Sequence, residues 1–178
     1  MKNIILLLLM FCSVFNLNAQ EEGTDDLKKF GEHEVKINAI MLVVGAVEVG
    51  YEYLLNNYSG IGISAFVAYD EELKDDIEYF VSPYYRYYFG KKYAGGFFLE
   101  GFGMLNRIER DIDILFFEDD DENFVTDFAL GIGLGGKWIT NGGFFGEVNY
   151  GIARNLFNNE ESDWDLVGKF GISVGYRF

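Results

Sequence analysis

Three glycines in the second half of the chain are spaced like a dinucleotide-binding fingerprint. Gly131, Gly133 and Gly136 fit the pattern G-x-G-x-x-G. That pattern holds a pyrophosphate only where a strand ends in a tight turn and a helix begins, because the helix N-terminus supplies backbone donors. Here bulky apolar residues alternate with small ones through the glycines and on to Trp138. We therefore interpret the glycines as small residues on the inner face of a strand, and we predict no bound cofactor.

The single histidine and the single cysteine are poor candidates for catalysis. A histidine base needs a nucleophile and an orienting acid beside it, and the sequence shows no such set around His33. Cys12 falls in an N-terminal segment that we expect to be removed, so the mature chain would lack a thiol for catalysis, metal binding or a disulfide. We predict no catalytic residue, no enzymatic activity and no metal site.

The densest charge run is acidic and covers Glu118, Asp119, Asp120, Asp121 and Glu122. It lacks the spaced oxygens and the central glycine of a high-affinity calcium loop. We interpret it as a solvated outer loop, with weak divalent-cation binding that bridges to lipopolysaccharide phosphates as the alternative.

Three apolar residues precede this run, namely Leu115, Phe116 and Phe117. An apolar run in an exposed loop marks a contact with lipid or with a protein partner. The alternative is that the flanking strands extend through it above the membrane.

The first nineteen residues have the pattern of an export signal. Lys2 supplies the positive start, residues 4–15 form a short apolar core, and Ala19 is a small residue at the expected cleavage site. Residues 20–34 are polar and acidic, and we interpret them as a flexible periplasmic lead. The sequence therefore predicts export across the inner membrane of a Gram-negative cell.

Composition narrows the class of protein. The net charge of −15 argues against nucleic-acid binding. One proline, 22 glycines and an aromatic share of 18% suit many strands joined by tight turns. After the export signal, the sequence contains no run of about 18 apolar residues, so we predict no transmembrane helix.

Period-two alternation predicts eight strands in residues 35–178. Their expected ranges are 35–44, 47–55, 60–69, 77–89, 96–106, 124–139, 144–155 and 164–178. The connections alternate between short and long, as in outer-membrane barrels with short periplasmic turns and longer outer loops. The first hairpin, near Gly45, is the exception, because its outer loop would be unusually tight. The fold class we predict is all-β, an eight-stranded antiparallel up-and-down transmembrane β-barrel.

One face of each strand is apolar, whereas the other carries small or charged residues. A charge on the lipid face at mid-membrane costs about 2–4 kcal/mol, so the charged face must point inward. A barrel of eight strands has room inside only for side chains, and buried charges persist only in pairs. We predict a lumen charge network made of Glu48, Glu52, Arg86, Glu100, Asp127, Lys137, Glu147, Lys169 and Arg177.

Two further features concern individual strands. The last strand ends in an alternating apolar pattern that we interpret as the signal for the barrel-assembly machinery, made of Phe170, Ile172, Val174, Tyr176 and Phe178.

Pro83, the sole proline, falls within the fourth strand, where it lacks a donor for the ladder. We predict a bulge or a locally missing bond there.

The sequence resembles domain-of-unknown-function family 3575 over nearly all of the mature chain. The segments that carry the resemblance are HEVKINA (33–39), YEYLLN (51–56), SPYYRYYF (82–89), GFG (101–103), GIGLGGKW (131–138) and GYRF (175–178). The resemblance implies a small exported outer-membrane barrel, similar in architecture to the OmpA and OmpX type. It implies no activity and no catalytic residues.

Several functions remain open at this point. We favour a non-enzymatic outer-membrane barrel with a structural or surface-interaction role through its acidic outer loops, as a separate protein or as a small subunit of a complex. Its expected partners are outer-membrane lipid, lipopolysaccharide and an unidentified protein. The alternatives are a narrow porin-like pore, a membrane lipid-modifying enzyme, and a soluble periplasmic ligand binder of lipocalin type.

Overall fold

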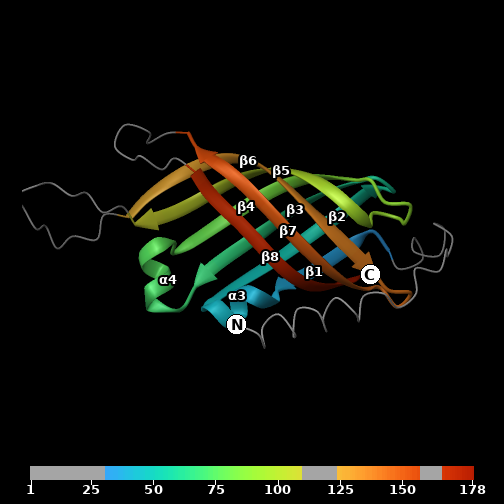
Figure 1. Ribbon diagram of the computed structural model, residues 1–178, viewed down its shortest axis with the longest axis horizontal. Coiled ribbons are helices and arrows are strands. Elements are labelled where there is room, and N and C mark those ends of the chain that lie inside the picture. Colours follow the sequence, from blue (N-terminus) through green and yellow to red (C-terminus); the bar gives the residue numbers. More distant parts are fainter. Residues whose placement is uncertain (1–30, 110–123, 157–165) are drawn as a thin grey trace, which may run out of the picture.

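The computed structural model describes residues 31–109, 124–156 and 166–178. They form a closed antiparallel barrel in which each strand pairs with its neighbours in chain order and β8 returns to β1 (Figure 1). The strands are β1 His33–Asn38, β2 Ala46–Asn56, β3 Ser59–Ala68, β4 Tyr79–Tyr88, β5 Gly96–Glu109, β6 Phe124–Ile139, β7 Phe144–Asn155 and β8 Leu166–Arg177. The predicted eight-stranded up-and-down barrel is therefore confirmed.

Two short helices lie in the connections at one end of the barrel. Helix α3, Ala39–Val44, joins β1 to β2, and helix α4, Glu71–Asp76, joins β3 to β4. We call this the loop end, and the opposite end, where β1 begins and β8 stops, the terminal end. Within the described residues, no helix has the length and apolar character needed to cross a membrane.

The structure corrects the beginning of the chain in two places. The first strand starts at His33, so His33 and Glu34 belong to the barrel and not to the flexible lead predicted for residues 20–34. The strand also stops at Asn38, and residues 39–44, predicted as strand, form α3. The helix supplies the chain length that the first hairpin lacked in the sequence-based prediction. Residues 1–30, which include the predicted export signal, lie outside the described residues.

The side chains inside the lumen form three layers, an apolar layer toward each end and a charged layer between them. The layers arise because the inward residues of neighbouring strands follow the same sequence of types along the barrel. The inward residues of β4 run Tyr84, Arg86 and Tyr88, and those of β5 run Phe102, Glu100 and Phe98 from the loop end to the terminal end. The apolar layer at the loop end contains Ala46, Phe66, Ala68, Phe80, Tyr84, Phe102, Met104, Ala129 and Ala153. The apolar layer at the terminal end contains Leu54, Tyr88, Tyr93, Ala94, Phe98, Ile139 and Phe145.

Pro83 interrupts one ladder without shifting its register. Val81 pairs with Leu105 and Tyr84 pairs with Phe102, whereas the pairs expected at Ser82 and Pro83 are missing between β4 and β5. The register is the same on both sides of the gap, with two residues of each strand between the flanking pairs. Neither strand therefore has an extra residue, and there is no bulge. Of the two outcomes predicted for Pro83, the structure has the locally missing pairing.

The glycines of the apparent dinucleotide fingerprint are strand residues within β6. A β-carbon at Gly131 would lie 2.5 Å from Phe102 Cζ and 2.6 Å from the Ile152 carbonyl oxygen. The absence of a side chain there lets the Phe102 ring fill the lumen. No turn or helix follows the glycines, and β6 continues to Ile139, so the motif is structural.

We expect Gly131→Ala to lower the free energy of unfolding by about 1–3 kcal/mol, because the added methyl overpacks a filled wall. The matched control is Gly101→Ala on β5, where an added β-carbon meets nothing within 4 Å. Urea unfolding in detergent or lipid vesicles measures both variants. Equal stability of the two variants would contradict the close packing around Gly131.

Candidate functional site

Nine charged side chains form one connected cluster between the two apolar layers of the lumen. Its acids are Glu34, Glu52, Glu100 and Glu147, and its bases are Lys36, Arg86, Lys137, Lys169 and Arg177. Every strand except β3 contributes at least one member. The cluster therefore ties the barrel wall together across its interior.

Arg86 is the centre of the cluster and is fully buried. Its guanidinium donates to Glu100 Oε2 at 2.7 Å, to Glu147 Oε2 at 2.6 Å and to Glu52 Oε2 at 3.2 Å. Because these acids come from β5, β7 and β2, one side chain joins three walls of the barrel. A guanidinium suits this position because its planar fork presents several donors at once.

Lys137 completes a second centre nearer the terminal end. Its ammonium lies 2.6 Å from Glu34 Oε2 and 3.3 Å from Glu52 Oε2, and it donates to the Tyr88 hydroxyl at 2.5 Å. The Tyr88 hydroxyl in turn donates to Glu52. Burial of these charges is tolerable because each ion has opposite charges and hydrogen-bond partners around it.

Aromatic rings form part of the same site. The Tyr84 ring has three cations around it, with Arg86 Cζ at 4.5 Å, Lys36 Nζ at 5.1 Å and Lys169 Nζ at 5.2 Å from its centroid. The Tyr84 hydroxyl donates to Glu52 at 3.3 Å. A ring face attracts cations at such distances, so Tyr84 stabilises the basic members of the cluster from the side of the loop-end apolar layer.

The turn between β4 and β5 covers the terminal end of the lumen. Arg177 donates to the carbonyl oxygens of Tyr93 at 2.9 Å and Ala94 at 3.0 Å, while it also binds Glu34. Both turn residues are buried. Ala94 has a positive φ of 41°, an uncommon conformation that tertiary contacts must hold. The last charged residue of β8 thus fixes a turn that closes the barrel.

The structure brings together most of the predicted network and adds members to it. Seven of the nine predicted residues belong to the cluster, namely Glu52, Arg86, Glu100, Lys137, Glu147, Lys169 and Arg177. Glu48 and Asp127 are also buried but lie nearer the loop end, where Glu48 accepts from Asn38 at 2.6 Å and Asp127 accepts from the Phe128 N–H at 2.6 Å.

Glu34 and Lys36 are members that sequence reasoning missed. Glu34 was assigned to the flexible lead, although it and Lys36 alternate with the apolar residues Val35 and Ile37. That alternation was the signal that could have placed them in the lumen. The alternation of the fourth strand already places Tyr84 and Tyr88 on the same inward face as Arg86, but their hydroxyls were not predicted as partners of the charged residues.

His33 is part of an aromatic group on the outer wall at the terminal end. Its Nδ1 lies 2.6 Å from the Tyr51 hydroxyl, and its ring stacks on Tyr51 and Phe178 at 6.0 and 5.9 Å between centroids. Phe178 also joins the ladder, because its N–H donates to the His33 carbonyl at 2.8 Å. These contacts tie His33 into the packing of the outer wall.

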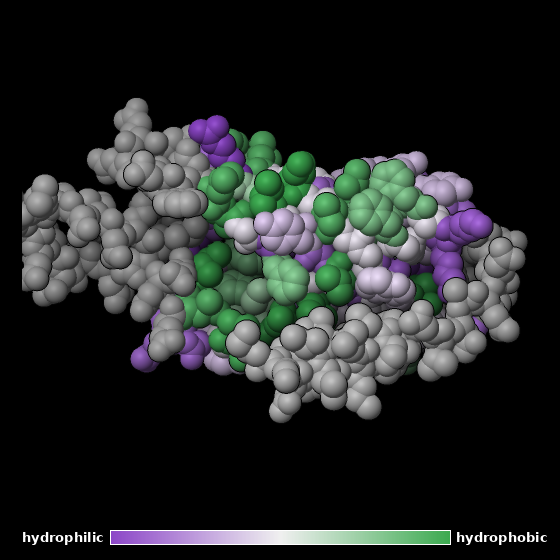
Figure 2. Space-filling model, viewed as in Figure 1, coloured by the Kyte–Doolittle hydropathy of each residue, from purple (hydrophilic) through white to green (hydrophobic). Residues whose placement is uncertain are grey.

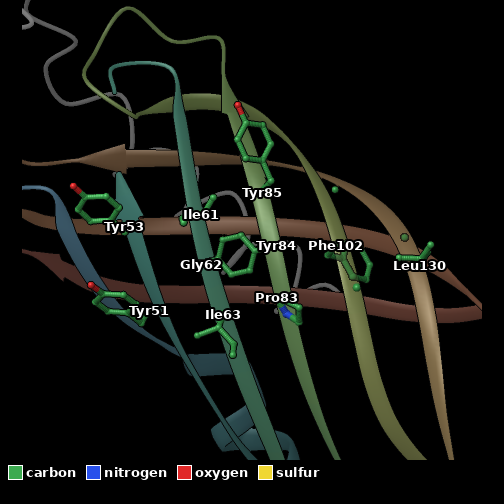
Figure 3. Close-up of a pocket in the computed structure, with 13 residues that line it drawn as sticks. Tyr51, Tyr53, Ile61, Gly62, Ile63, Pro83, Tyr84, Tyr85, Phe102 and Leu130 are labelled. Atoms are coloured by element: carbon green, nitrogen blue, oxygen red, sulfur yellow. The ribbon is translucent and has the colours of Figure 1, made fainter. Parts of the chain in front are cut away.

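A groove of about 820 Å³ lies on the outer wall and crosses β2 to β6 (Figure 3). Its lining combines small or compact residues, Pro83, Gly101 and Gly103, with the larger Ile63, Tyr85 and Leu130. The groove belongs to the apolar exterior of the barrel. The acidic run at residues 118–122 and the apolar Leu115, Phe116 and Phe117 lie outside the described residues.

Comparison with known proteins agrees with this architecture. The chain belongs to the DUF3575 family, described as a protein of unknown function, whose model matches residues 4–178. The N-terminal β-barrel domain of Pseudomonas aeruginosa OprF is similar in structure, with a TM-score of 0.59 and 17% identity over 82% of this chain and 96% of that one.

A second solved structure, the Yersinia pestis outer membrane protein Ail in a phospholipid bilayer nanodisc, matches with a TM-score of 0.45 and 14% identity over 83% of this chain and 99% of that one. No curated protein shows significant similarity to the chain. At 17% identity, the likeness to the OprF domain supports the fold and nothing further.

We expect Arg86→Met to lower the free energy of unfolding by about 3–5 kcal/mol, because it leaves Glu52, Glu100 and Glu147 buried without their shared cation. The control is Arg107→Met, which removes a half-exposed pair with Glu78 and should cost about 0–1 kcal/mol. Urea unfolding in lipid vesicles measures the difference. A loss for Arg86→Met no larger than for Arg107→Met would contradict the central role of Arg86.

Proposed function

We propose that the protein is a non-enzymatic, integral barrel of the cell outer membrane that acts through its outer loops. The observation that supports this proposal is the inverted polarity of the barrel. The inside holds a buried ion-pair cluster, and the outside is apolar, with exposed residues such as Ile132 at 71% and Leu130 at 54%. Figure 2 shows hydrophobic residues across the middle of the described wall and hydrophilic ones toward the ends. Such a surface requires a lipid environment.

Aromatic residues on the outer wall support the same placement. Most of the exposed aromatic residues lie in the half of the wall toward the terminal end, and they include Tyr51, Tyr58, Tyr85, Tyr87, Phe89, Phe97, Trp138, Phe144, Tyr176 and Phe178. Tyr69 is exposed at the loop end. Aromatic side chains of this kind sit at the boundary between lipid tails and headgroups. With the termini in the periplasm, this belt lies at the periplasmic interface, and the predicted acidic loops face outward.

The filled lumen argues against two of the alternatives. A narrow pore needs a continuous polar path, but an apolar layer covers the charge cluster at each end. A lipocalin-type binder needs an apolar interior and a polar exterior, which is the reverse of the observed arrangement. We therefore propose that the interior is structural, and that the partners, lipopolysaccharide or a protein of a larger complex, contact the loop end.

The first test is cell fractionation followed by electrophoresis with and without boiling. We expect a chain that lacks residues 1–19 in the outer-membrane fraction and that changes mobility on heating, because a closed barrel resists unfolding by detergent until heated. The comparison is Arg86→Met, whose band should change from the folded to the unfolded mobility at a lower temperature than that of the unchanged protein. A soluble periplasmic chain without a heat-dependent shift would overturn the membrane proposal.

The second test addresses the outer loops. We expect neutralisation of the five acids at 118–122 to Asn or Gln to reduce magnesium-dependent binding of purified lipopolysaccharide to the barrel in phospholipid vesicles, because the cation can no longer bridge carboxylate and phosphate. The charge-matched control neutralises the five acids of residues 70–76. Unchanged binding by the first variant would contradict a role for this run in contact with lipopolysaccharide. A second variant, in which Leu115, Phe116 and Phe117 are replaced by Ser, is measured in the same binding assay. It tests a contribution from apolar contact separately from that of the acidic charges.

A further inference from the structure

The two connections that the structure describes at the loop end differ in chemistry. Helix α3 in the first has the sequence AIMLVV, without a charged or hydrogen-bonding side chain. Helix α4 in the second has the sequence EELKDD. An exposed apolar segment marks a contact with lipid or with a partner, so the first hairpin lacks the polar surface that suits a loop in water.

Helix α3 occupies a place in the barrel wall. It follows β1 in the chain and, like β1, lies beside both β8 and β2 (Figure 1). Met41 packs against the apolar layer at the loop end of the lumen. Leu42, Val43 and Val44 are exposed, and Val43 is exposed by 86%. The helix thus covers the lumen with one side chain and leaves three apolar side chains outside the barrel.

The exposed side of α3 continues into the apolar outer wall. Val47 at the start of β2 pairs with Val67 near the end of β3, and both are exposed. Tyr69 follows β3, and its hydroxyl donates to the Leu42 carbonyl at 2.7 Å. We call this surface the α3 patch, which consists of Leu42, Val43, Val44, Val47, Val67 and Tyr69. Its continuity with the wall means that whatever covers the wall at this level also meets the helix.

Backbone carbonyls at the end of α3 are bonded within the protein. The Gly45 N–H donates to the Met41 carbonyl at 3.0 Å, and the Tyr69 hydroxyl bonds the next carbonyl, that of Leu42. The Gly45 carbonyl accepts from the N–H groups of Tyr69 at 2.8 Å and Asp70 at 3.0 Å. The last carbonyls of a helix commonly bond to water, but in lipid they need partners from the protein. Partners of this kind are what an end of a helix in lipid requires.

The start of the helix is closed by a buried side chain. Asn38 donates from Nδ2 to the Phe170 carbonyl at 3.2 Å, and its Oδ1 accepts from the Ile172 N–H at 3.2 Å. Both groups belong to the backbone of β8, beside the helix. The same Nδ2 donates to Glu48 of β2 at 2.6 Å. These polar groups next to α3 are therefore satisfied without water, as in a wall that faces lipid.

We propose that α3 is a lipid-facing segment of the barrel wall and that acyl chains of the outer leaflet cover the α3 patch. This inference rests on the proposed membrane location, in which the loop end faces outward. Lipid is the occupant that matches both the apolar side chains and the internally bonded backbone. The first hairpin then has no loop in water, so contacts with a partner outside the membrane fall to the connections after β3, β5 and β7.

Spin labels on single cysteines test this placement, because the chain without its predicted export signal has no cysteine. Val43→Cys reports on the α3 patch, Ile132→Cys on the exposed outer wall and Lys74→Cys on the exposed side of α4. Each labelled chain is refolded in phosphatidylcholine vesicles. Electron paramagnetic resonance then measures how often the label collides with oxygen, which concentrates among acyl chains, and with a water-soluble nickel complex.

We expect the ratio of oxygen to nickel collisions at position 43 to be several-fold higher than at position 74, as at position 132. A water-type ratio at position 43 together with a lipid-type ratio at position 132 would overturn the inference and leave the proposed function intact. Water-type ratios at both positions would overturn the proposed function itself. A label at position 43 that meets neither reagent would also overturn the inference, because polypeptide and not lipid would then cover the patch.

Val44→Cys is a second reporter if the label at position 43 prevents refolding. Val44 is exposed on the same helix, so we expect the same several-fold difference from position 74. Met41→Cys is the inward control, because a label packed against the lumen layer should meet both reagents rarely. If α3 instead leaves the wall for water, positions 41 and 44 will share the water-type ratio of position 74, and the inference is wrong.

Discussion

The ion-pair cluster around Arg86 is the interaction on which the rest of the structure depends. Four carboxylates and five cations occupy a space without bulk water, and each would be costly alone. The cost of burying them is offset only when opposite charges meet, so the strands that carry them must close into one barrel. Closure in turn gives every strand two neighbours and removes the free edges that sheets usually have to protect.

The apolar layers on either side of the cluster explain how a narrow barrel can hold so many charges. Tyr84 and Phe102 cover it toward the loop end, and Tyr88 and Phe98 cover it toward the terminal end. The rings exclude water, which strengthens each ion pair, and their faces also attract the cations. Inward glycines such as Gly62 and Gly131 make room for these rings. The lumen is therefore a solid core made from polar and aromatic residues, and the exterior is left apolar for lipid.

The wall departs from this regular pairing in two places. At the β4–β5 ladder the pairing breaks at Pro83, and at the β8 edge the Asn38 amide replaces a strand. The first break follows from the covalent chemistry of proline. The second follows from the register of the first hairpin, because residue 40 would lie opposite Ala46 and residues 41–44 must therefore turn toward β2.

Much of this arrangement was determined by the sequence itself, because the alternation of apolar with small or charged residues along a strand shows which side chains face lipid and which face the lumen. The eight strands, the inward charges at Arg86 and Lys137, and the outward apolar face follow from alternation alone. Only the tertiary structure decided which charges meet, since Lys137 pairs with Glu34 from 103 positions away through the register of strands far apart in the chain. It also decided that residues 39–44 form a helix. Their composition favours a strand, but a six-residue segment follows its packing and the Asn38 contacts more than its own propensity.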